Sequence, residues 1–331
     1  SGAAIGSGLG IFLGGMILDT WNAAWPDAAT APLGIKGWQA AFMIVGLPGI
    51  LMAFWVSTLR EPLRGQADGI VSKPHAHPFR EAALVLLSML PIGNFLIFSK
   101  SKNGRSILLK NLLFAISITF AAYVLTSITG DALQWITLSA GIYAAFSWIQ
   151  ALAIRDPVVY GMLFNCKTLR YIIIGDALIG FNMGASFWII PLLQRYFNIS
   201  AADIGFVLGI AAVLLGVAGI IVGGILADFL RTRTSKGKLF VYLAGAMCTS
   251  LSILILVSTD SKIIAYVAVF SSIFAGSLAL GPVISTVNDL VLPRGRATTI
   301  GIFFMITLLC GSAIAPYIAG SISDALIATG K

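Results

Sequence analysis

Residues 223–238 read GGILADFLRTRTSKGK and stand between two long apolar runs, at about 203–227 and 239–258. The first run ends in glycines, an Asp and a basic cluster, and the second run follows at once. Short basic loops between apolar helices are typical of proteins that cross a membrane several times. The stretch therefore predicts a cytoplasmic loop between two membrane spans.

The composition points the same way. Hydrophobic residues make up 58% of the 331 residues and charged residues only 10%, against about 25% charged in a soluble domain. Charges cluster in short loops that separate runs of about twenty apolar residues, which is the length that crosses a bilayer. The expected fold is therefore an all-α, polytopic helical membrane protein with about nine spans, at about 1–18, 37–58, 107–128, 134–154, 171–193, 203–227, 239–258, 263–287 and 299–321.

A weaker run, 82–99, contains Pro91, Gly93 and Asn94. If it does not cross, 17 of the 21 Lys and Arg residues fall on one side of the membrane, and if it crosses the division becomes 14 against 7. Basic residues concentrate in cytoplasmic loops, so the more asymmetric assignment is preferred. The run 82–99 is then predicted to lie along the cytoplasmic face as an interfacial helix, or to dip into the membrane and return.

The net charge of +8 is explained by cytoplasmic loops, and no nucleic-acid partner is expected. The expected partners are the lipid bilayer, a small-molecule substrate and a coupling ion, H⁺ or Na⁺. His75 and His77 are too few for a metal site, so no metal or cofactor is expected. The sequence contains no nucleotide-binding loop of the kind that an ATP-driven pump needs.

Glycines recur at a spacing of four in two of the runs, at Gly2, Gly6, Gly10 and Gly14, at Gly205 and Gly209, and at Gly219 and Gly223. Small residues on one helix face let backbones approach closely inside a membrane. They predict either tight packing alone or, in addition, faces that slide during transport.

The stretch Gly224-Ile225-Leu226-Ala227-Asp228 with its basic continuation resembles the conserved loop motif of the major facilitator superfamily, in the copy between the eighth and ninth helices. Other stretches agree. Residues 2–15 resemble the fifth helix, 37–42 and 59–65 the sixth helix and its exit, 288–297 the link from the tenth to the eleventh helix, and 311–324 the eleventh helix. The combination is loosely similar to spinster-like members.

The resemblance also shows departures. Phe229 stands where the motif has a basic residue, Gly237 comes later than its usual glycine, and Gln39 replaces a commoner Arg. The resemblance implies an incomplete bundle, a fragment without the first four helices and the twelfth. It further implies the end of the N-terminal half at 1–65, a central insert at 66–154 with two extra spans, and the C-terminal half at 155–331.

Asp176 is the one carboxylate placed inside a span. A charge at that depth costs several kcal/mol unless it is paired or faces water, so it is a candidate for binding a proton or a cation. The alternative is an interfacial acid paired with Arg170 or Lys167.

The same helix carries candidates for substrate contact, because the resemblance implies that it lines the central cavity: Asn182, Ser186, Trp188 and Gln194. Asn182 and Ser186 are four residues apart and share a helix face. The alternatives are helix–helix hydrogen bonding for Asn182 and a place in the interfacial aromatic belt for Trp188.

The resemblance implies that the motif residues latch cytoplasmic helix ends in the outward-facing state: Gly224, Asp228, Arg231 and Arg233. The alternative is an anchor that sets topology. A second cytoplasmic cluster contains Asp289, Arg294 and Arg296, and is expected to meet the Asp228 loop or the 60–64 loop.

The expected function is that of a secondary active transporter in the plasma (inner) membrane, with its basic loops in the cytoplasm, working by alternating access. It would move a small organic solute, coupled to an ion or proton gradient. The alternatives are a non-transporting sensor of similar fold and a membrane enzyme. The enzyme is disfavoured because only one carboxylate lies at depth.

Overall fold

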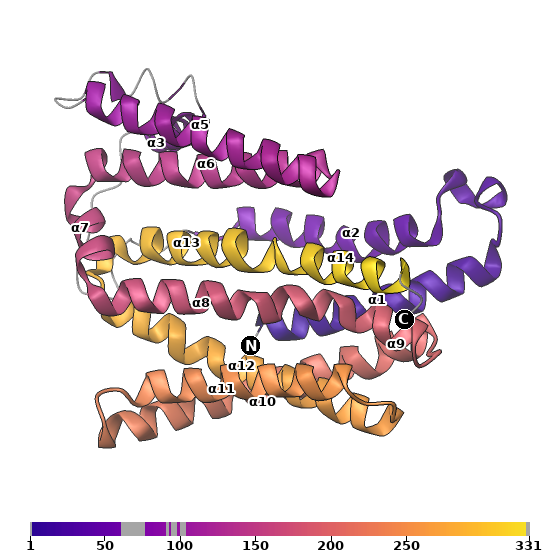
Figure 1. Cartoon of the computed structure of the whole chain (residues 1–331). Helices are drawn as coiled ribbons and strands as arrows, with labels where there is room; N and C mark the ends of the chain where they lie inside the picture. Colours follow the sequence, from indigo (N-terminus) through magenta and orange to yellow (C-terminus); the bar gives the residue numbers. More distant parts are fainter. Residues whose placement is uncertain (1, 61–76, 91–92, 94–97, 100–103, 329–331) are drawn as a thin grey trace. The chain divides into compact units, whose positions relative to one another are not determined.

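The structure is a computed structural model that describes residues 2–60, 77–90, 93, 98–99 and 104–328. Helices and the turns between them account for the described residues, and no strand occurs among them. Figure 1 follows the helices along the chain. Part of the run predicted at 82–99, with Pro91 and Asn94, and the predicted exit at 61–65 lie outside these residues, as does His75.

Nine helical segments of the described chain are long and apolar enough to cross a membrane. Each coincides with one of the nine predicted runs, and most extend a few residues beyond it. The prediction of a polytopic helical membrane protein is confirmed. Membrane spans are helical because a helix satisfies its own backbone hydrogen bonds, and a bilayer offers the backbone no partners.

The chain divides into two compact units, each built from two stretches. Unit 1 comprises Ser1–Pro62 and Ala185–Thr286, and unit 2 comprises Leu63–Gly184 and Val287–Lys331. Two of the three boundaries fall inside the helices α8 (Lys167–Ala185) and α12 (Lys262–Asp289). The division of the sequence into 1–65, 66–154 and 155–331 stays a prediction.

In unit 1, α1 (Gly2–Ala24) runs antiparallel to α10 (Ala201–Arg233). A Cβ atom added at Gly209 would lie 2.8 Å from the carbonyl oxygen of Gly8, and one at Gly205 would lie 3.0 Å from that of Ile11. Asp19 near the end of α1 accepts a hydrogen bond from the Ala202 backbone N–H, 2.8 Å away. This carboxylate satisfies one of the donors that a helix leaves unpaired at its N-terminus.

The remaining helices of unit 1 are α2, α9, α11 and α12, with short 3₁₀ turns. Their bounds are Gly37–Ser57 for α2, Ile189–Arg195 for α9 and Gly237–Val257 for α11, with 3₁₀ turns at Ala28–Thr30, Pro32–Gly34 and Ser186–Trp188. Glycine also allows α10 to lie close to α12. A Cβ added at Gly219 of α10 would lie only 2.5 Å from the Phe274 carbonyl oxygen of α12, so the contact leaves no room for a side chain.

The glycine predictions are therefore partly confirmed. Gly205, Gly209, Gly219 and Gly223 all pack against neighbouring backbone. The predicted stripe on the first helix does not form a packing face with the described residues, since an added Cβ at Gly2, Gly6, Gly10 or Gly14 would meet none of them within 4 Å. The glycines of α1 that do touch α10 are Gly8 and Gly15, seven residues apart. A spacing of seven is two helical turns and also returns to one face.

Unit 2 contains the two central spans α5 (Gly104–Thr129) and α6 (Ala132–Arg155), which form an antiparallel hairpin. It also contains α3 (Pro78–Met89), α7 (Pro157–Asn165) and α8 as far as Gly184. From Pro293 the chain continues through a 3₁₀ turn (Pro293–Gly295), α13 (Arg296–Thr307), a π-helical segment (Leu308–Ser312) and α14 (Ala315–Ala328).

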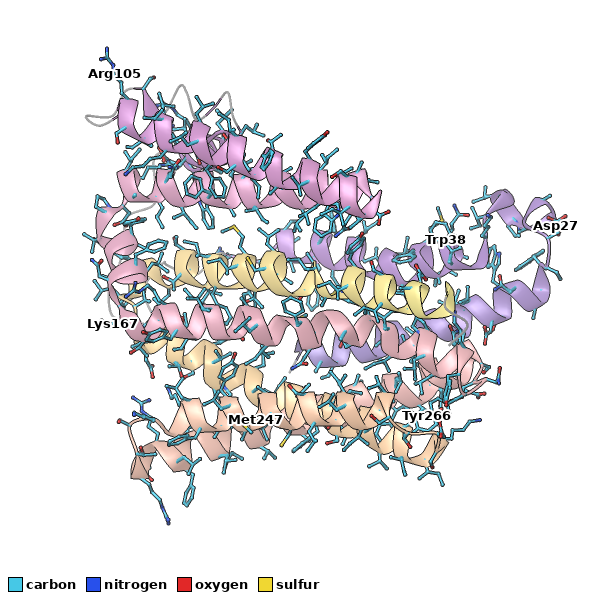
Figure 2. All side chains as sticks on the ribbon, viewed as in Figure 1. Asp27, Trp38, Arg105, Lys167, Met247 and Tyr266 are labelled. Carbon is cyan, nitrogen blue, oxygen red and sulfur yellow. The ribbon has the colours of Figure 1, made fainter. Side chains whose placement is uncertain are left out.

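Basic side chains gather at one end of unit 2, which we call the basic end. It contains the C-terminus of α6 and the N-termini of α5, α8 and α13, with Arg105, Arg155, Lys167, Arg170, Arg294 and Arg296. Figure 2 labels Arg105 and Lys167 there. This is the charge segregation expected for the cytoplasmic side of a membrane protein.

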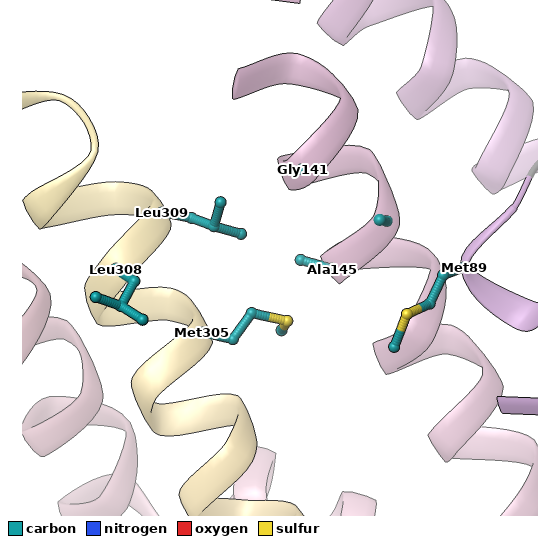
Figure 3. A pocket seen from close by; sticks show the side chains of 7 residues that line it. Met89, Gly141, Ala145, Met305, Leu308 and Leu309 are labelled. Atoms are coloured by element: carbon teal, nitrogen blue, oxygen red, sulfur yellow. The ribbon is translucent and has the colours of Figure 1, made fainter. Parts of the chain in front are cut away.

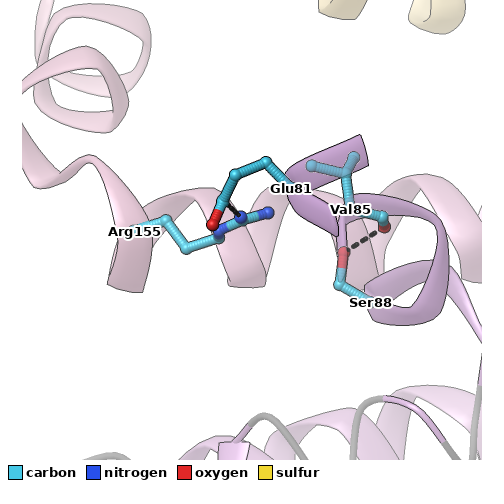
Figure 4. A network of polar contacts seen from close by, with 4 residues as sticks. All are labelled: Glu81, Val85, Ser88 and Arg155. Carbon is cyan, nitrogen blue, oxygen red and sulfur yellow. Dashed lines mark hydrogen bonds and ion pairs between the residues drawn. The ribbon is translucent and has the colours of Figure 1, made fainter. Parts of the chain in front are cut away.

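The helix α3 lies antiparallel to α6. Glu81 near its start pairs with Arg155 at the end of α6, and Ser147 of α6 donates a hydrogen bond to the Ser88 carbonyl oxygen over 3.0 Å. Figure 4 shows the Glu81–Arg155 pair and the Ser88 hydroxyl, which bonds the Val85 carbonyl oxygen within α3. The helix thus starts at the basic end and follows α6 for two turns away from it.

A buried polar cluster holds α3, α5 and α6 together. Asn111 of α5 donates to Gln150 at 2.8 Å and to Ser147 at 3.2 Å, and it accepts from the Tyr143 hydroxyl at 2.7 Å. Ser88, Asn111 and Ser147 are all buried. Polar groups without such partners would be costly inside a membrane.

Candidate functional site

Asp176 lies on α8, nine residues beyond Lys167. At a rise of 1.5 Å per residue, its backbone is about 14 Å from the start of the helix. Thr307 at the end of α13 donates a hydrogen bond from its hydroxyl to Asp176 Oδ2 over 2.7 Å. Thr307 is buried, and the same hydroxyl is 3.0 Å from the Phe303 carbonyl oxygen. The structure thus gives Asp176 a partner on a neighbouring helix that the sequence did not indicate.

The two helices meet closely just beyond this hydrogen bond. A Cβ added at Gly180 would lie 2.9 Å from the Thr307 carbonyl oxygen, and one at Gly311 would lie against the Ala177 carbonyl oxygen, closer than van der Waals contact allows. Ser312 donates to the Gly180 carbonyl oxygen over 3.2 Å. Asp176 is therefore next to a contact between backbones that only glycine permits.

A π-helical turn interrupts the partner helix at this point. The Ala313 N–H donates to the Leu308 carbonyl oxygen over 2.8 Å, which is an i to i+5 hydrogen bond. Such single π turns occur inside α-helices and are frequent at functional sites. The turn lies between α13 and α14 inside the single span Pro293–Ala325, which agrees with the span predicted at 299–321.

The predicted substrate contacts do not lie on one regular helix. Asn182 is half-buried on α8 in unit 2, whereas Ser186, Trp188 and Gln194 belong to unit 1. Ser186 and Trp188 form a 3₁₀ turn, and Gln194 lies on α9. Pro191 explains the break, because it has no N–H for the Phe187 carbonyl and its ring crowds that group. A shared substrate cavity for these four residues stays a prediction.

The motif stretch is helical where the sequence predicted a loop. The helix α10 continues to Arg233, so Gly224, Asp228 and Arg231 lie on its last three turns. Arg231 and Arg233 stand in the final turn, where positive charge interacts favourably with the helix dipole. The Arg233 guanidinium lies 4.8 Å from the centre of the Phe229 ring. The departure at Phe229 therefore has a structural role as a cation–π partner.

The connection to α11 is short and depends on Gly237. A Cβ at this position would lie 2.5 Å from the Arg231 backbone nitrogen, whereas one at Gly224 would meet nothing within 4 Å. Lys238 follows, only 8% exposed, and its ammonium donates to the Ser285 hydroxyl over 2.7 Å. The sequence placed Lys238 in a cytoplasmic loop, and the structure places it at the start of α11, where it is buried beside α12.

The second predicted cluster occupies the basic end of unit 2. Asp289 ends α12 and is exposed, Arg294 lies in the 3₁₀ turn, and Arg296 begins α13. Arg294 pairs with Asp156, with 3.5 Å between a guanidinium nitrogen and Oδ1. Asp156 caps α7 by accepting from the Val159 N–H at 3.1 Å. The sequence analysis did not single out Asp156. Its signal is an Asp directly before a Pro, which is typical of a helix N-terminus.

No model of a known protein family matches this chain. A curated protein from Mycolicibacterium smegmatis (strain ATCC 700084 / mc(2)155), described as an MFS-type efflux pump, is 27% identical over 134 residues. The aligned part is 40% of this chain and 31% of that protein, so the match spans about a third of the relative's length. The similarity supports membership in the major facilitator superfamily. It also supports a membrane transporter in general rather than an enzyme.

Proposed function

We propose that the chain is part of a secondary active transporter that moves a small organic solute across the plasma (inner) membrane by alternating access. The observation that carries the proposal is Asp176, a carboxylate within an apolar span that accepts a hydrogen bond from Thr307 on the neighbouring helix. An ionisable group at such depth is a candidate for coupling. In our proposal its protonation is linked to the rearrangement of the helices around the substrate.

The glycine contact beside Asp176 supports this role. A protonated carboxyl group carries no charge, so burial away from water costs it less free energy than it costs the ionised form. The contact at Gly180 and Gly311 permits the helices to shift without displacing bulky side chains. Asn182 lies two residues beyond Gly180 on the same helix and is proposed to contact the substrate.

The cytoplasmic ends would hold one of the two transport states. We propose that Asp228, Arg231 and Arg233 form a latch at the end of α10, and that the cluster of Asp289, Arg294 and Arg296 forms another at the basic end of unit 2. Exposed ion pairs contribute only about 0–1 kcal/mol each, which suits contacts that must open in every cycle. The basic end of unit 2 and the C-terminal end of α10, with Arg231 and Arg233, are proposed to face the cytoplasm.

The test uses the full-length protein reconstituted into proteoliposomes with a pH-sensitive dye inside. We expect the native protein to move protons when a transported organic solute is added on one side. Asp176→Asn should abolish this coupled flux, because the amide cannot bind and release a proton. The matched control is Asp203→Asn, which changes an exposed acid in the first turn of α10. This variant should transport normally.

Three outcomes separate the candidates. Uptake by Asp176→Asn with an unchanged pH profile would remove Asp176 from the mechanism. Sodium-dependent flux without proton movement would assign Na⁺ as the coupling ion. A native protein that binds solutes but moves none of them would support the alternative, a sensor of similar fold.

A further inference from the structure

Unit 2 contains an apolar cavity of about 290 Å³ between α6 and the junction of α13 with the π-helical turn. Its walls are Gly141, Ala144 and Ala145 of α6, Met305, Leu308 and Leu309 on the other side, and Met89 at the end of α3. Figure 3 shows the side chains of Met305 and Leu309 directed across the gap toward Ala145 and Met89. The function proposed above does not use this cavity.

The position of the cavity along the helices is close to the middle of the spans. Ala145 precedes Arg155 by ten residues, and Met305 follows Arg296 by nine, so both lie about 15 Å from the basic end. The hydrocarbon core of a bilayer is about 30 Å thick. With the basic end at the membrane surface, the cavity would lie near the bilayer centre, where neither water nor lipid headgroups are present.

Among the described residues, the lining offers no group that could orient a polar ligand. It consists of aliphatic side chains, two thioethers and a glycine. Apolar linings take up apolar guests, and an enclosed cavity of roughly 150 Å³ already accommodates benzene. A volume of about 290 Å³ has room for a longer apolar group. Methionine side chains adapt their shape and so accept flexible guests.

The cavity is continuous with the membrane-facing surface. Leu308 forms part of its wall and is nevertheless 47% exposed. The exposed side chains of α5 and α6 include Ile136, Phe120 and Tyr123, as expected for helices that face lipid. The opening beside Leu308 is where a hydrocarbon chain from the bilayer would enter.

We propose that this cavity is a binding site for the terminal part of a lipid acyl chain. The chain would fill the space between Ala145 and Leu309, with its headgroup at the membrane surface. This inference is independent of transport, because it concerns binding at equilibrium and requires neither Asp176 nor a substrate.

The experiment uses the full-length protein in liposomes that contain a phosphatidylcholine with a photoactivatable diazirine near the end of one acyl chain. After illumination, cross-linked peptides are identified by mass spectrometry. We expect labelling of the peptides that carry Met305 and Leu309 at several times the level found on the exposed face of α5 around Phe120. A lipid with the diazirine next to the headgroup should label the cavity at least fivefold less.

Two variants fill the cavity from opposite walls, and a third variant serves as a control. Ala145→Trp and Leu309→Trp should each reduce labelling of the cavity peptides at least fivefold. Ile136→Trp adds the same side chain to an exposed position of α6, off the face that carries Gly141, Ala144 and Ala145, and should leave labelling unchanged. Because each filling variant comes from a different helix, misfolding of one leaves the other as a test.

The source of the guest is decided by competition. An excess of unlabelled phosphatidylcholine should reduce the signal in proportion to its mole fraction, whereas preference for a free apolar compound such as decane over the phospholipid would overturn the assignment to a lipid chain. Labelling of the cavity no stronger than that around Phe120, or equal labelling in Ala145→Trp and the native protein, would show that no chain occupies the site.

Discussion

Thr307 donates a hydrogen bond from its hydroxyl to the Asp176 carboxylate, over 2.7 Å between two helices that are far apart in sequence. The bond lies one turn before the contact of Gly180 with the partner helix. It joins the one acid predicted inside a span to the residue that precedes a π-helical turn. The first two predictions concern this junction.

Thr307→Val should weaken the junction without removing the acid. The substitution keeps the shape of the side chain and deletes the hydroxyl. A hydrogen bond to a charged group contributes about 1.5–3 kcal/mol, so we expect a lower melting temperature and slower coupled transport. Thr307→Ser should restore both. Thermal unfolding in detergent and the rate of uptake measure them, and a Val variant identical to the native protein in both would contradict the role of the bond.

Gly311→Ala should be strongly destabilising, because its Cβ would overlap the Ala177 carbonyl oxygen. Overpacking of a close contact costs typically 1–3 kcal/mol. Gly175→Ala is the matched control on α8, since its Cβ would meet nothing within 4 Å. Thermal melting of the two purified variants makes the comparison. Equal melting temperatures would show that the backbones are not in contact there.

Gly224 on α10 and Gly237 at the start of α11 should respond to substitution in opposite ways. Gly237→Ala forces a methyl group against the Arg231 backbone and should lower stability by more than 1 kcal/mol. Gly224→Ala enters open space within a helix and should be neutral or stabilising by up to about 1 kcal/mol. Unfolding monitored by thermal shift measures both. A Gly224 variant that melts normally yet stops transport would assign that glycine a role in the cycle.

The helix α3 should enter the bilayer at an angle. Phe79 and Leu86 are both exposed, seven residues apart, and α3 follows α6 away from the basic end. Their depths should therefore differ by about 10 Å. Spin labels at Phe79→Cys and Leu86→Cys, read by oxygen and nickel-complex accessibility in liposomes, measure this depth. Equal depths would favour the other predicted arrangement, a helix flat on the cytoplasmic face.

Tyr196, just beyond the span that ends at Arg195, donates a hydrogen bond to Asp260, and this bond raises the pKa of the Tyr196 hydroxyl above its usual 10.0. Because the folded-state pKa is raised, the contact is intact at neutral pH and is lost as the pH rises through the raised value. An ultraviolet titration of the native protein minus Tyr196→Phe should therefore show one tyrosine that ionises above pH 10. Asp260→Asn should bring that ionisation down, and an unshifted ionisation would contradict the contact.

Several features of the fold could be predicted from the sequence because they depend on local composition. The nine spans follow from runs of apolar residues, and each coincides with a helix of the described chain. The depth of Asp176 follows from counting along its run. The close packing at Gly205, Gly209, Gly219 and Gly223 follows from small residues on one helix face.

Other features could not be predicted because they join residues distant in the chain. Nothing in the sequence around Thr307 indicates that it contacts Asp176, and nothing around Lys238 indicates burial against Ser285. On α1, the spacing of four residues pointed to glycines that do not touch α10. A helix has several faces, and the position of the neighbouring helix decides which face packs. The motif was read as a loop because it is polar, although a polar stretch can prolong a helix beyond the membrane.

The sequence by itself determined that this chain crosses a membrane many times and which residues lie in each span, because the cost of exposing a backbone or a charge to lipid acts on each segment separately. Tertiary structure alone decided which polar groups became partners, which glycines became contacts and where an apolar cavity remained. These depend on the register in which helices meet, and a shift of one residue turns a side chain by about 100° around the helix axis.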